Sequence, residues 1–286
     1  MYRYKKNQPV NKLKLTFSLT LAACACLASA QQPLYEQFRA HNAAMTAVQP
    51  AWMSPLIQPD PRLSQSVRLS FSNSYTPART QTENYGNGHT VGVVLGDRVQ
   101  LNFMAPAYFQ NHSAAAADGF GDTMVEGKYR LVSGNAQHGD FALTALLAYS
   151  APTGSHLNGA ATGVYFPNLA AGRAWGRFNV QTTLGGYLPT GKIAAQGRSI
   201  SWNWTAQLHP TQHAWLDIED NPTFNFGGPF DRKTENFVTP AAFYLLRPKA
   251  WAPTHSFLVF DCGMQIATSG FHTYNHNLIA ETRYMF

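Results

Sequence analysis

The sequence predicts an all-β protein, a single antiparallel transmembrane β-barrel of about twelve strands. Segments of alternating polarity recur from about residue 64 to the end, and the last of them, residues 275–286, finishes on aromatic side chains. The connections between the segments are alternately long and short. A period of two is the pattern of a strand with one apolar face, and alternating loop lengths are typical of outer-membrane barrels whose termini both lie in the periplasm.

Residues 1–30 have the pattern of a secretory signal peptide. Five Lys and Arg residues precede or enter an apolar run, and Ala28-Ser29-Ala30 provides a small-x-small cleavage site. A second cleavage site is available, because residues 21–24 (Leu-Ala-Ala-Cys) resemble a lipoprotein box, but apolar sequence continues past Cys24. We therefore expect cleavage after Ala30, which assigns the chain to the cell envelope.

Charge and cysteine content also depend on this cleavage. The whole chain has 21 Lys and Arg against 15 Asp and Glu, and the signal contains five of the basic residues and no acid. The mature chain is therefore nearly neutral, and the basic pI of 9.2 does not indicate nucleic acid as a partner. Only Cys262 survives cleavage, so no internal disulfide can form. Charged residues are 13% of the chain, well below the usual share of about 25% in soluble domains.

Residues 31–63 differ in composition from the rest. Leu34, Phe38, Met45 and Val48 have roughly helical spacing, and four prolines follow between residues 50 and 61. This stretch is either a periplasmic leader or a partial plug of the barrel lumen, and the sequence slightly favours a poorly ordered leader. Residues 64–286 form the expected barrel.

Twelve segments are expected to be strands: residues 66–75, 90–95, 98–106, 120–131, 141–150, 164–174, 177–187, 199–209, 213–224, 236–247, 255–267 and 275–286. Long connections are expected at residues 77–87, 107–119, 151–163, 188–198, 224–235 and 268–274, with shorter ones at the opposite end. The segment at 199–209 alternates most regularly, which places Trp202 and Trp204 toward lipid and Asn203 toward the lumen. The same argument turns Cys262 toward lipid.

The alternation also assigns a set of charged side chains to the lumen. These are Arg68, Arg98, Asp122, Glu126, Lys128, Arg130, Arg177, Asp217, Glu219, Asp261, Glu281 and Arg283. One interpretation is a channel whose opposed charges orient a solute, with the arginines near the short-turn end favouring anionic groups. The other is that the charges pair across neighbouring strands and fill the interior. The alternation leaves both open.

No catalytic constellation is evident, and we expect no enzyme, cofactor or metal. Outer-membrane phospholipases carry a His and a Ser two residues apart on a strand, and none of the ten histidines has that spacing. Asp217 and Glu219 share a face, which ordinary pairing explains. His272 and His276 lack a third metal ligand.

Two resemblances point in the same direction. The last strand, with Tyr284 and the terminal Phe286, resembles the signal that bacterial barrel-assembly machinery recognises. Gly119-Phe120-Gly121-Asp122 followed by Lys128-Tyr129-Arg130, and Pro-Thr-Gly at residues 152–154 and 189–191, resemble outer-membrane transporters grouped with the meta-cleavage pathway of phenol degradation. That resemblance covers about residues 60–286. It implies a barrel that takes up small, often aromatic, compounds, and it implies no catalytic residues.

We therefore expect a barrel in the bacterial outer membrane, surrounded by lipid, that lets a small organic solute, aromatic compounds included, pass into the periplasm. The alternative is a structural or surface-binding barrel with a plugged lumen and no transport. Pore conductance distinguishes the two.

Overall fold

The computed structural model describes residues 36–286 except 87, 115, 250 and 252–255. The chain divides into two compact units, residues 1–43 and 44–286. In the first unit the described residues 36–43 are helical, with Arg39 paired to Glu36 at 3.3 Å. Residues 44–47 of the second unit are helical as well, as the spacing of apolar residues predicts. Among the described residues, no helix is long and apolar enough to cross a membrane.

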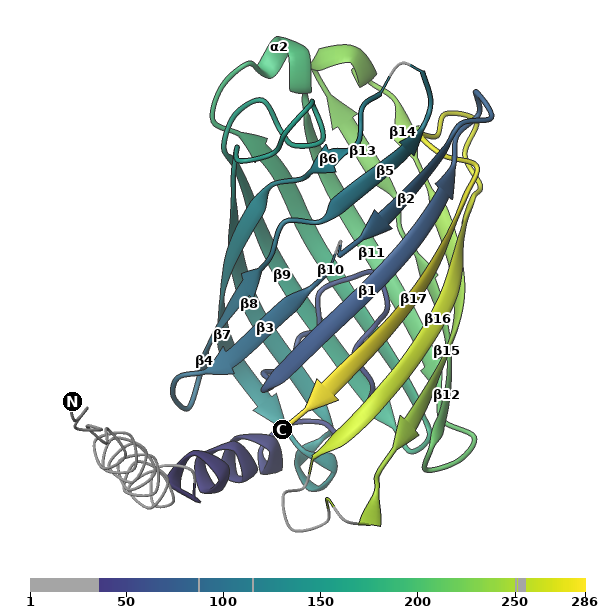
Figure 1. Ribbon diagram of the computed structural model, residues 1–286. Coiled ribbons are helices and arrows are strands. Elements are labelled where there is room, and N and C mark those ends of the chain that lie inside the picture. The colour runs from purple at the N-terminus through teal and green to yellow at the C-terminus, as the bar shows by residue number, and fades with distance from the viewer. Residues whose placement is uncertain (1–35, 87, 115, 250, 252–255) are drawn as a thin grey trace, which may run out of the picture. The chain divides into compact units, whose positions relative to one another are not determined.

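The second unit is a closed antiparallel barrel of twelve strands (Figure 1), which confirms the predicted fold. The strands are β1 (Ser66–Tyr75), β2 with β3 (Gln81–Tyr85, Thr90–Val94), β4 with β5 (Val99–Met104, Tyr108–His112), β6 with β7 (Gly119–Phe120, Thr123–Gly134), β8 (Phe141–Ala151), β9 (Val164–Trp175), β10 (Phe178–Pro189), β11 (Arg198–Leu208), β12 with β13 (Ala214–Asp220, Thr223–Phe226), β14 with β15 (Thr234–Glu235, Phe237–Leu246), β16 (Phe257–Ala267) and β17 (His276–Met285). Short helices η1 (Ala136–His138), α2 (Ile193–Gln196) and η2 (Gly228–Phe230) lie in connections.

Barrel closure is made by the first and last strands. β1 pairs with β17 from Ser66↔Met285 to Tyr75↔His276, so the C-terminal strand has a neighbour on both sides. A sheet closed in this way leaves no edge whose N–H and C=O groups would face lipid unpaired. The expected loops at 77–87 and 107–119 are strand in part, because β2 and β5 pair with each other and extend the ladder beyond the predicted strands.

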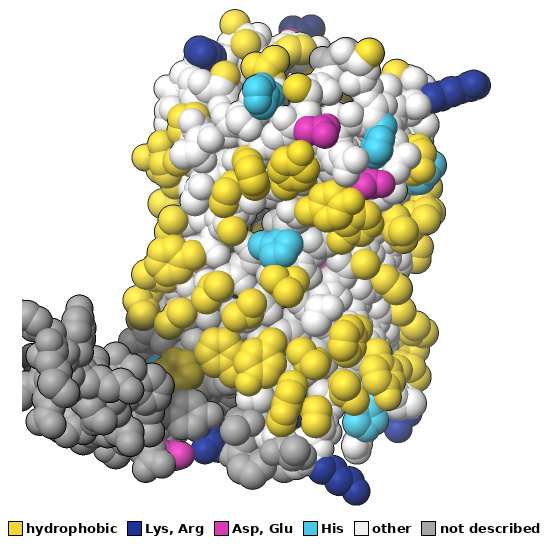
Figure 2. Space-filling view, viewed as in Figure 1, with side chains coloured by type: hydrophobic (Ala, Val, Ile, Leu, Met, Phe, Trp, Pro, Cys, Tyr) yellow, Lys and Arg dark blue, Asp and Glu magenta, His cyan; other side chains and the backbone are white. Residues whose placement is uncertain are grey.

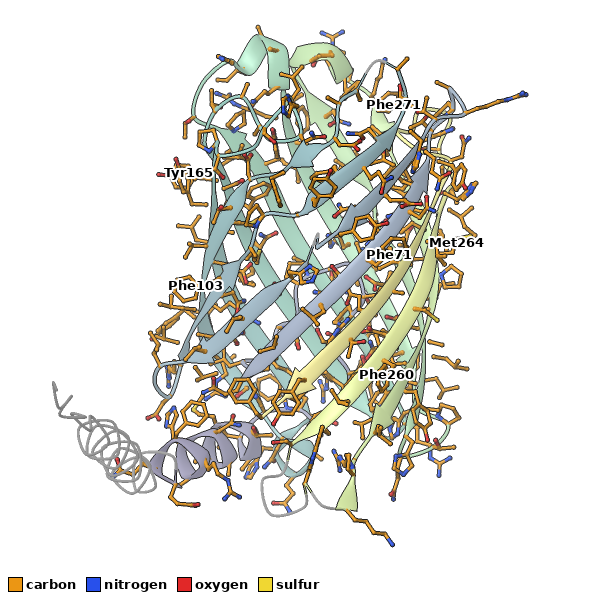
Figure 3. The ribbon with its side chains drawn as sticks, in the orientation of Figure 1. Phe71, Phe103, Tyr165, Phe260, Met264 and Phe271 are labelled. Atoms are coloured by element: carbon orange, nitrogen blue, oxygen red, sulfur yellow. The ribbon has the colours of Figure 1, made fainter. Side chains whose placement is uncertain are left out.

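The outward faces are apolar. Leu69, Phe103, Tyr129, Trp202 and Trp204 are among many large hydrophobic side chains that are 41–53% exposed. Figure 2 shows such side chains covering the wall, with Lys and Arg near its two ends, and Figure 3 shows the labelled Phe103, Tyr165, Phe260 and Met264 pointing away from the barrel. Exposed apolar surface on this scale is stable only in contact with lipid. The outward assignments of Trp202, Trp204 and Cys262 are confirmed.

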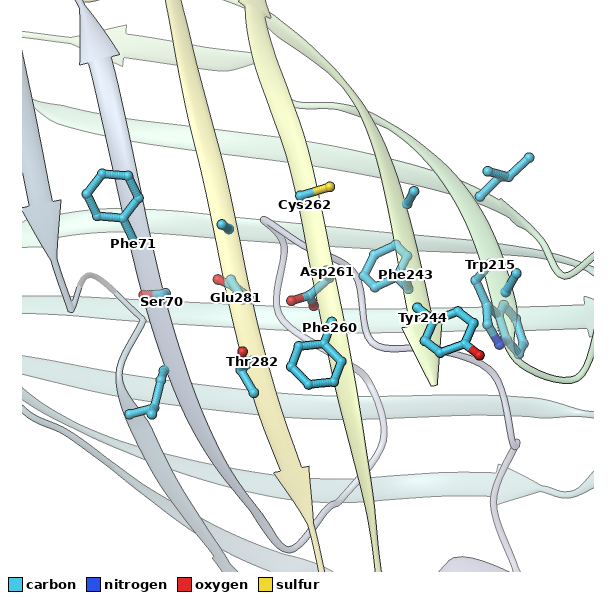
Figure 4. A pocket seen from close by; sticks show the side chains of 15 residues that line it. Ser70, Phe71, Trp215, Phe243, Tyr244, Phe260, Asp261, Cys262, Glu281 and Thr282 are labelled. Atoms are coloured by element: carbon cyan, nitrogen blue, oxygen red, sulfur yellow. The ribbon is translucent and has the colours of Figure 1, made fainter. Parts of the chain in front are cut away.

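Two local features modify the regular alternation. At Leu131 in β7 the register shifts by one residue, so that Leu131 and Val132 are both exposed; this is a β-bulge. On the outer wall, Ala280, Cys262 and Ala242 face one another in register across β17, β16 and β15, and larger side chains such as Phe71 and Phe260 surround them (Figure 4). The small residues leave a shallow apolar depression in the lipid-facing surface.

Candidate functional site: the lumen and its inner segment

Residues 48–64, which we call the inner segment, lie inside the barrel and contact its wall. In Figure 1 this part of the chain is the purple trace behind β1 and β17. Pro50, Pro55, Pro59 and Pro61 have no N–H, and their fixed φ angles prevent helix or ladder formation along most of the segment. Carbonyl groups in such a segment have no partners within it, so burial requires donors from elsewhere. The inward-facing side chains of the wall supply them.

Cationic groups of the wall bind the carbonyl oxygens of the inner segment. Lys128 Nζ lies 2.7 Å from Asp60 O and 2.5 Å from Arg62 O. Arg283 donates to Ser54 O and Pro55 O, both at 2.9 Å, and Arg68 donates to Leu56 O at 2.7 Å. Three basic groups from three different strands therefore hold the backbone of residues 54–62.

Glu219 binds the opposite kind of backbone group. Its carboxylate, fully buried, accepts the N–H groups of Leu56 at 2.6 Å, Ile57 at 2.9 Å and Gln58 at 3.2 Å. Three successive amides directed at one carboxylate form an anion-binding arrangement, in which the anion comes from the wall and the amides from the inner segment. Asp217, two residues away on the same face, lies beside Glu219 and accepts a hydrogen bond from Gln207 at 3.5 Å. The two acids that share a face thus have different surroundings.

Further acids neutralise the arginines that hold the inner segment. Arg283 pairs with Asp261 at 2.7 Å and with Glu281 at 3.0 Å, and Glu281 also pairs with Arg68 at 2.5 Å. These side chains come from β1, β16 and β17, which are adjacent at barrel closure. Because buried charges are stable only when paired and hydrogen-bonded, this network fixes the guanidinium groups against the inner segment.

Asp60 belongs to the inner segment itself. It pairs with Arg62 at 2.8 Å, within the same bend that Lys128 holds. Burial acts to raise the pKa of Asp60, but the positive charges of Arg62 and Lys128 outweigh it and hold that pKa below its ordinary value. Asp60 is therefore ionised at neutral pH, and the positive charge of Arg62 in the same bend balances its negative charge.

Neutral amides and hydroxyls complete the contact, and the charged residues predicted for the lumen do not include them. Gln181 donates to Met53 O at 3.0 Å and Ser133 to Val48 O at 2.8 Å, and Asn135 donates to Ala47 O, directly before the segment, at 2.8 Å. Gln100 accepts Ser64 N at 2.7 Å, and Thr144 donates to Pro61 O. The signal in the sequence was the number of inward amides on strands whose outward faces are apolar, beside a proline-rich stretch without partners.

The inner segment also has apolar contacts. Trp52, Met53 and Leu56 are each 6% exposed or less, and they form one cluster with inward side chains of the wall: Ala142, Trp215, Phe243, Leu245, Val259 and Ile279. A Cβ added at Gly263 would lie 2.6 Å from Leu56, and one added at Gly172 would lie 2.9 Å from Trp52. Glycine at these two positions lets the inner segment approach the wall.

The long-loop half of the lumen contains a pocket of about 220 Å³. Its lining is largely apolar and aromatic, with Met104, Phe109, Met124, Phe166 and Tyr187 facing it. It lies where three neighbouring strands are interrupted, between β2 and β3, β4 and β5, and β6 and β7. Ser150 and Asp122 add polar groups at its edge. A pocket of this composition can bind a small, mostly apolar molecule.

Asp122 anchors a loop beside this pocket. Its carboxylate accepts Gly154 N at 2.8 Å and Ala160 N at 2.7 Å, both in the connection between β8 and β9. A Cβ added at Gly159 would overlap Asp122 Oδ1, so glycine is needed there for the loop backbone to approach the acid. The Gly-Asp motif at residues 121–122 and the Pro-Thr-Gly motif at residues 152–154 are therefore in contact, because Gly154 N donates a hydrogen bond to Asp122.

The remaining charged residues divide into buried and exposed groups. Glu126 is buried and accepts from Asn102 at 2.7 Å, and Arg130 is buried and donates to Asp97 O at 2.5 Å. Arg98 and Arg177 lie in turns and are exposed. Of the four arginines expected near the short-turn end, Arg98 and Arg177 are therefore exposed, whereas Arg130 and Arg283 are buried.

Comparison with known proteins supports the fold. No family model matches the chain, and no curated protein matches it. The structure is similar to the crystal structure of an outer membrane channel from Pseudomonas putida F1, with a TM-score of 0.53 and 14% sequence identity over 82% of this chain and 100% of that one. The chain described here therefore folds as a barrel of the outer-membrane type. The NanC porin gives a TM-score of 0.49 at 7% identity, over 76% of this chain and 98% of that chain. No link to phenol degradation emerges from these likenesses.

Among the described residues, no group of three or more His, Cys, Asp and Glu side chains is arranged to hold a metal ion. What the lumen contains is a polar binding surface for a backbone and, toward the long loops, a small apolar pocket.

Proposed function

We propose that this protein is an outer-membrane channel for a small organic solute, and that the inner segment restricts its lumen. The observation that supports the proposal most is how the inner segment is held. Its carbonyl and N–H groups are bound by side chains of the wall, including Lys128, Glu219 and Arg283, and it forms no strand with the barrel. Contacts of this kind can be exchanged for water, so the segment can leave its position without unfolding a strand ladder.

The pocket near the long loops supports an apolar, ring-shaped solute. Phe109, Phe166 and Tyr187 offer aromatic surfaces, and Met104 and Met124 offer adaptable ones, around a volume of about 220 Å³. The resemblance to transporters grouped with phenol degradation points to the same class of solute. We propose that a small aromatic compound enters from the long-loop end and rests there before passing the inner segment.

Solute flux into proteoliposomes tests this proposal. We expect the refolded mature protein to pass phenol-sized aromatics faster than sugars of similar size. Ala107→Phe should fill the pocket and slow the aromatics, because Ala107 is buried in the pocket lining. Ala280→Phe is the matched control, since Ala280 lies on the outer wall. Equal flux of sugars and aromatics, unchanged by Ala107→Phe, would contradict the assignment of solute class.

A structural barrel with a permanently plugged lumen is the second candidate. The apolar packing of Trp52, Met53 and Leu56 against the wall favours it, because that packing stabilises the inner segment beyond its hydrogen bonds. Absence of flux for every solute, in the wild type and in variants that loosen the inner segment, would favour this candidate over a channel.

We further propose that the signal peptide ends at Ala30, and that Tyr284 and Phe286 form the signal for barrel assembly. The two rings stack at 5.6 Å between centroids at the end of the closing strand. Amino-terminal sequencing of the mature protein should begin at Gln31. Deleting Phe286 should lower the amount of heat-resistant folded barrel in cells much more than it lowers refolding in detergent. Equal losses in both settings would indicate a stability effect without recognition.

A further inference from the structure

Four basic side chains lie together at the long-loop end of the barrel, on connections that pack against each other. Lys192 and Arg198 flank α2, and Arg232 and Lys233 follow η2. A Cβ added at Gly228 would lie 2.5 Å from Gly197 N, so these two connections are in backbone contact. All four side chains are exposed, and that of Arg232 is 93% exposed. We call this set the basic rim.

The acidic side chains nearest these basic groups, Asp231 in the connection and Glu235 in β14, already have hydrogen-bond partners. Asp231 accepts Gly227 N at 2.6 Å and lies 3.7 Å from Arg232, and Glu235 accepts Thr273 Oγ1 at 2.7 Å. No carboxylate of the described residues lies within ion-pair distance of Lys192, Arg198 or Lys233. The basic rim therefore has a net positive charge that the described chain does not balance.

The position of the basic rim relative to the lipid is informative. Arg198 begins β11 on the same outward face as Ile200, Trp202 and Trp204, and it pairs in register with Phe226. Lys233 Nζ lies 4.7 Å from the ring centroid of Phe271, which packs on Phe230. Aromatic side chains at the end of an apolar wall mark the interface between hydrocarbon and headgroups. The positive charges thus lie at the depth of the headgroups, beside the lipid and away from the lumen.

We propose that the basic rim binds the phosphate groups of the phosphorylated glycolipid in the outer leaflet of the outer membrane. Guanidinium and ammonium groups bind phosphate through charge-assisted hydrogen bonds, and Arg does so with two parallel bonds. With both termini in the periplasm, the long loops face the outside, where this glycolipid forms the leaflet. The rim fixes the lipid at the wall of β11 and β13 and is separate from the path of a solute.

Native mass spectrometry of the refolded protein in micelles, with purified diphosphorylated glycolipid, tests the proposal. The test variant replaces Lys192, Arg198, Arg232 and Lys233 by Gln. The matched control replaces Arg98, Arg177, Arg247 and Lys249 by Gln, which removes the same charge from exposed positions at the opposite end. We expect the rim variant to bind at least about tenfold more weakly and the control to bind like the wild type. Heat-modifiable migration on gels verifies folding, and Arg198→Gln alone replaces the quadruple variant if the latter does not fold.

Three results would overturn the proposal. The first is equal loss of binding in the rim variant and in the control, which would indicate only net charge. The second is equal binding of the dephosphorylated glycolipid, which would place recognition in the acyl chains. The third is complete displacement by millimolar inorganic phosphate, which would indicate a site for free anions.

Discussion

Glu219→Ala should release the inner segment from the barrel wall. The substitution removes the acceptor of three backbone N–H groups, those of Leu56, Ile57 and Gln58, at a site without solvent exposure. A hydrogen bond to a charged group contributes about 1.5–3 kcal/mol, and because the three share one carboxylate and water can enter, we expect a total of about 3–5 kcal/mol. That loss corresponds to an increase of roughly 10²- to 10⁴-fold in the fraction of molecules with a displaced segment.

Limited trypsin digestion measures this displacement. Arg62 lies in the inner segment with its carbonyl held by Lys128, so cleavage after it requires release. When opening is fast relative to cleavage, the cleavage rate follows the open population. We expect Glu219→Ala to speed cleavage at Arg62. The control Asp217→Asn should leave the rate nearly unchanged, because it keeps the Glu219 carboxylate that accepts the three N–H groups. Similar cleavage rates in the wild type and Glu219→Ala would refute the assignment of Glu219 as an anchor.

Three further outcomes are expected. Trp204→Arg, about halfway along β11 on the lipid face, should lower the free energy of unfolding by about 2–4 kcal/mol in refolding titrations, whereas Asn203→Arg should cost clearly less; the reverse order would invert the barrel faces. A thiol reagent confined to water should label Cys262 slowly in membranes and quickly after denaturation; fast labelling of the native protein would contradict its lipid-facing position. Asp122→Ala should accelerate hydrogen exchange at the amides of Gly154 and Ala160 by roughly 30-fold or more; unchanged protection would show that the loop does not depend on the acid.

The sequence predicted the barrel because lipid imposes a strict rule on each strand. On β10 the outward Phe178 and Leu184 alternate with the buried Asn179, Gln181 and Thr183. This alternation of apolar and polar residues is present wherever one face of a strand contacts hydrocarbon. It fails where that constraint ends, as in β2, whose sequence Gln-Thr-Glu-Asn-Tyr is typical of a loop although it extends the ladder.

The contents of the lumen could not be predicted in the same way. The alternation of residues along each strand places Glu219 and Arg283 inside the barrel. It does not show that their partners are backbone groups of residues 54–58. Side-chain patterns carry no information about carbonyl and N–H groups, which are alike in every residue except proline. The prolines between residues 50 and 61 were therefore the best available indication that this segment depends on the wall.

Single-channel recording in planar bilayers tests most directly whether the inner segment, held by Glu219, controls the lumen. The wild type, Glu219→Ala and the control Asp217→Asn are compared as refolded mature proteins. We expect low conductance in the wild type and in the control, and a several-fold higher or more frequently open state in Glu219→Ala. Identical conductance in all three proteins, with trypsin cleavage at Arg62 already accelerated in Glu219→Ala, would show that displacing the segment does not open the barrel, and it would contradict the proposed role of the inner segment.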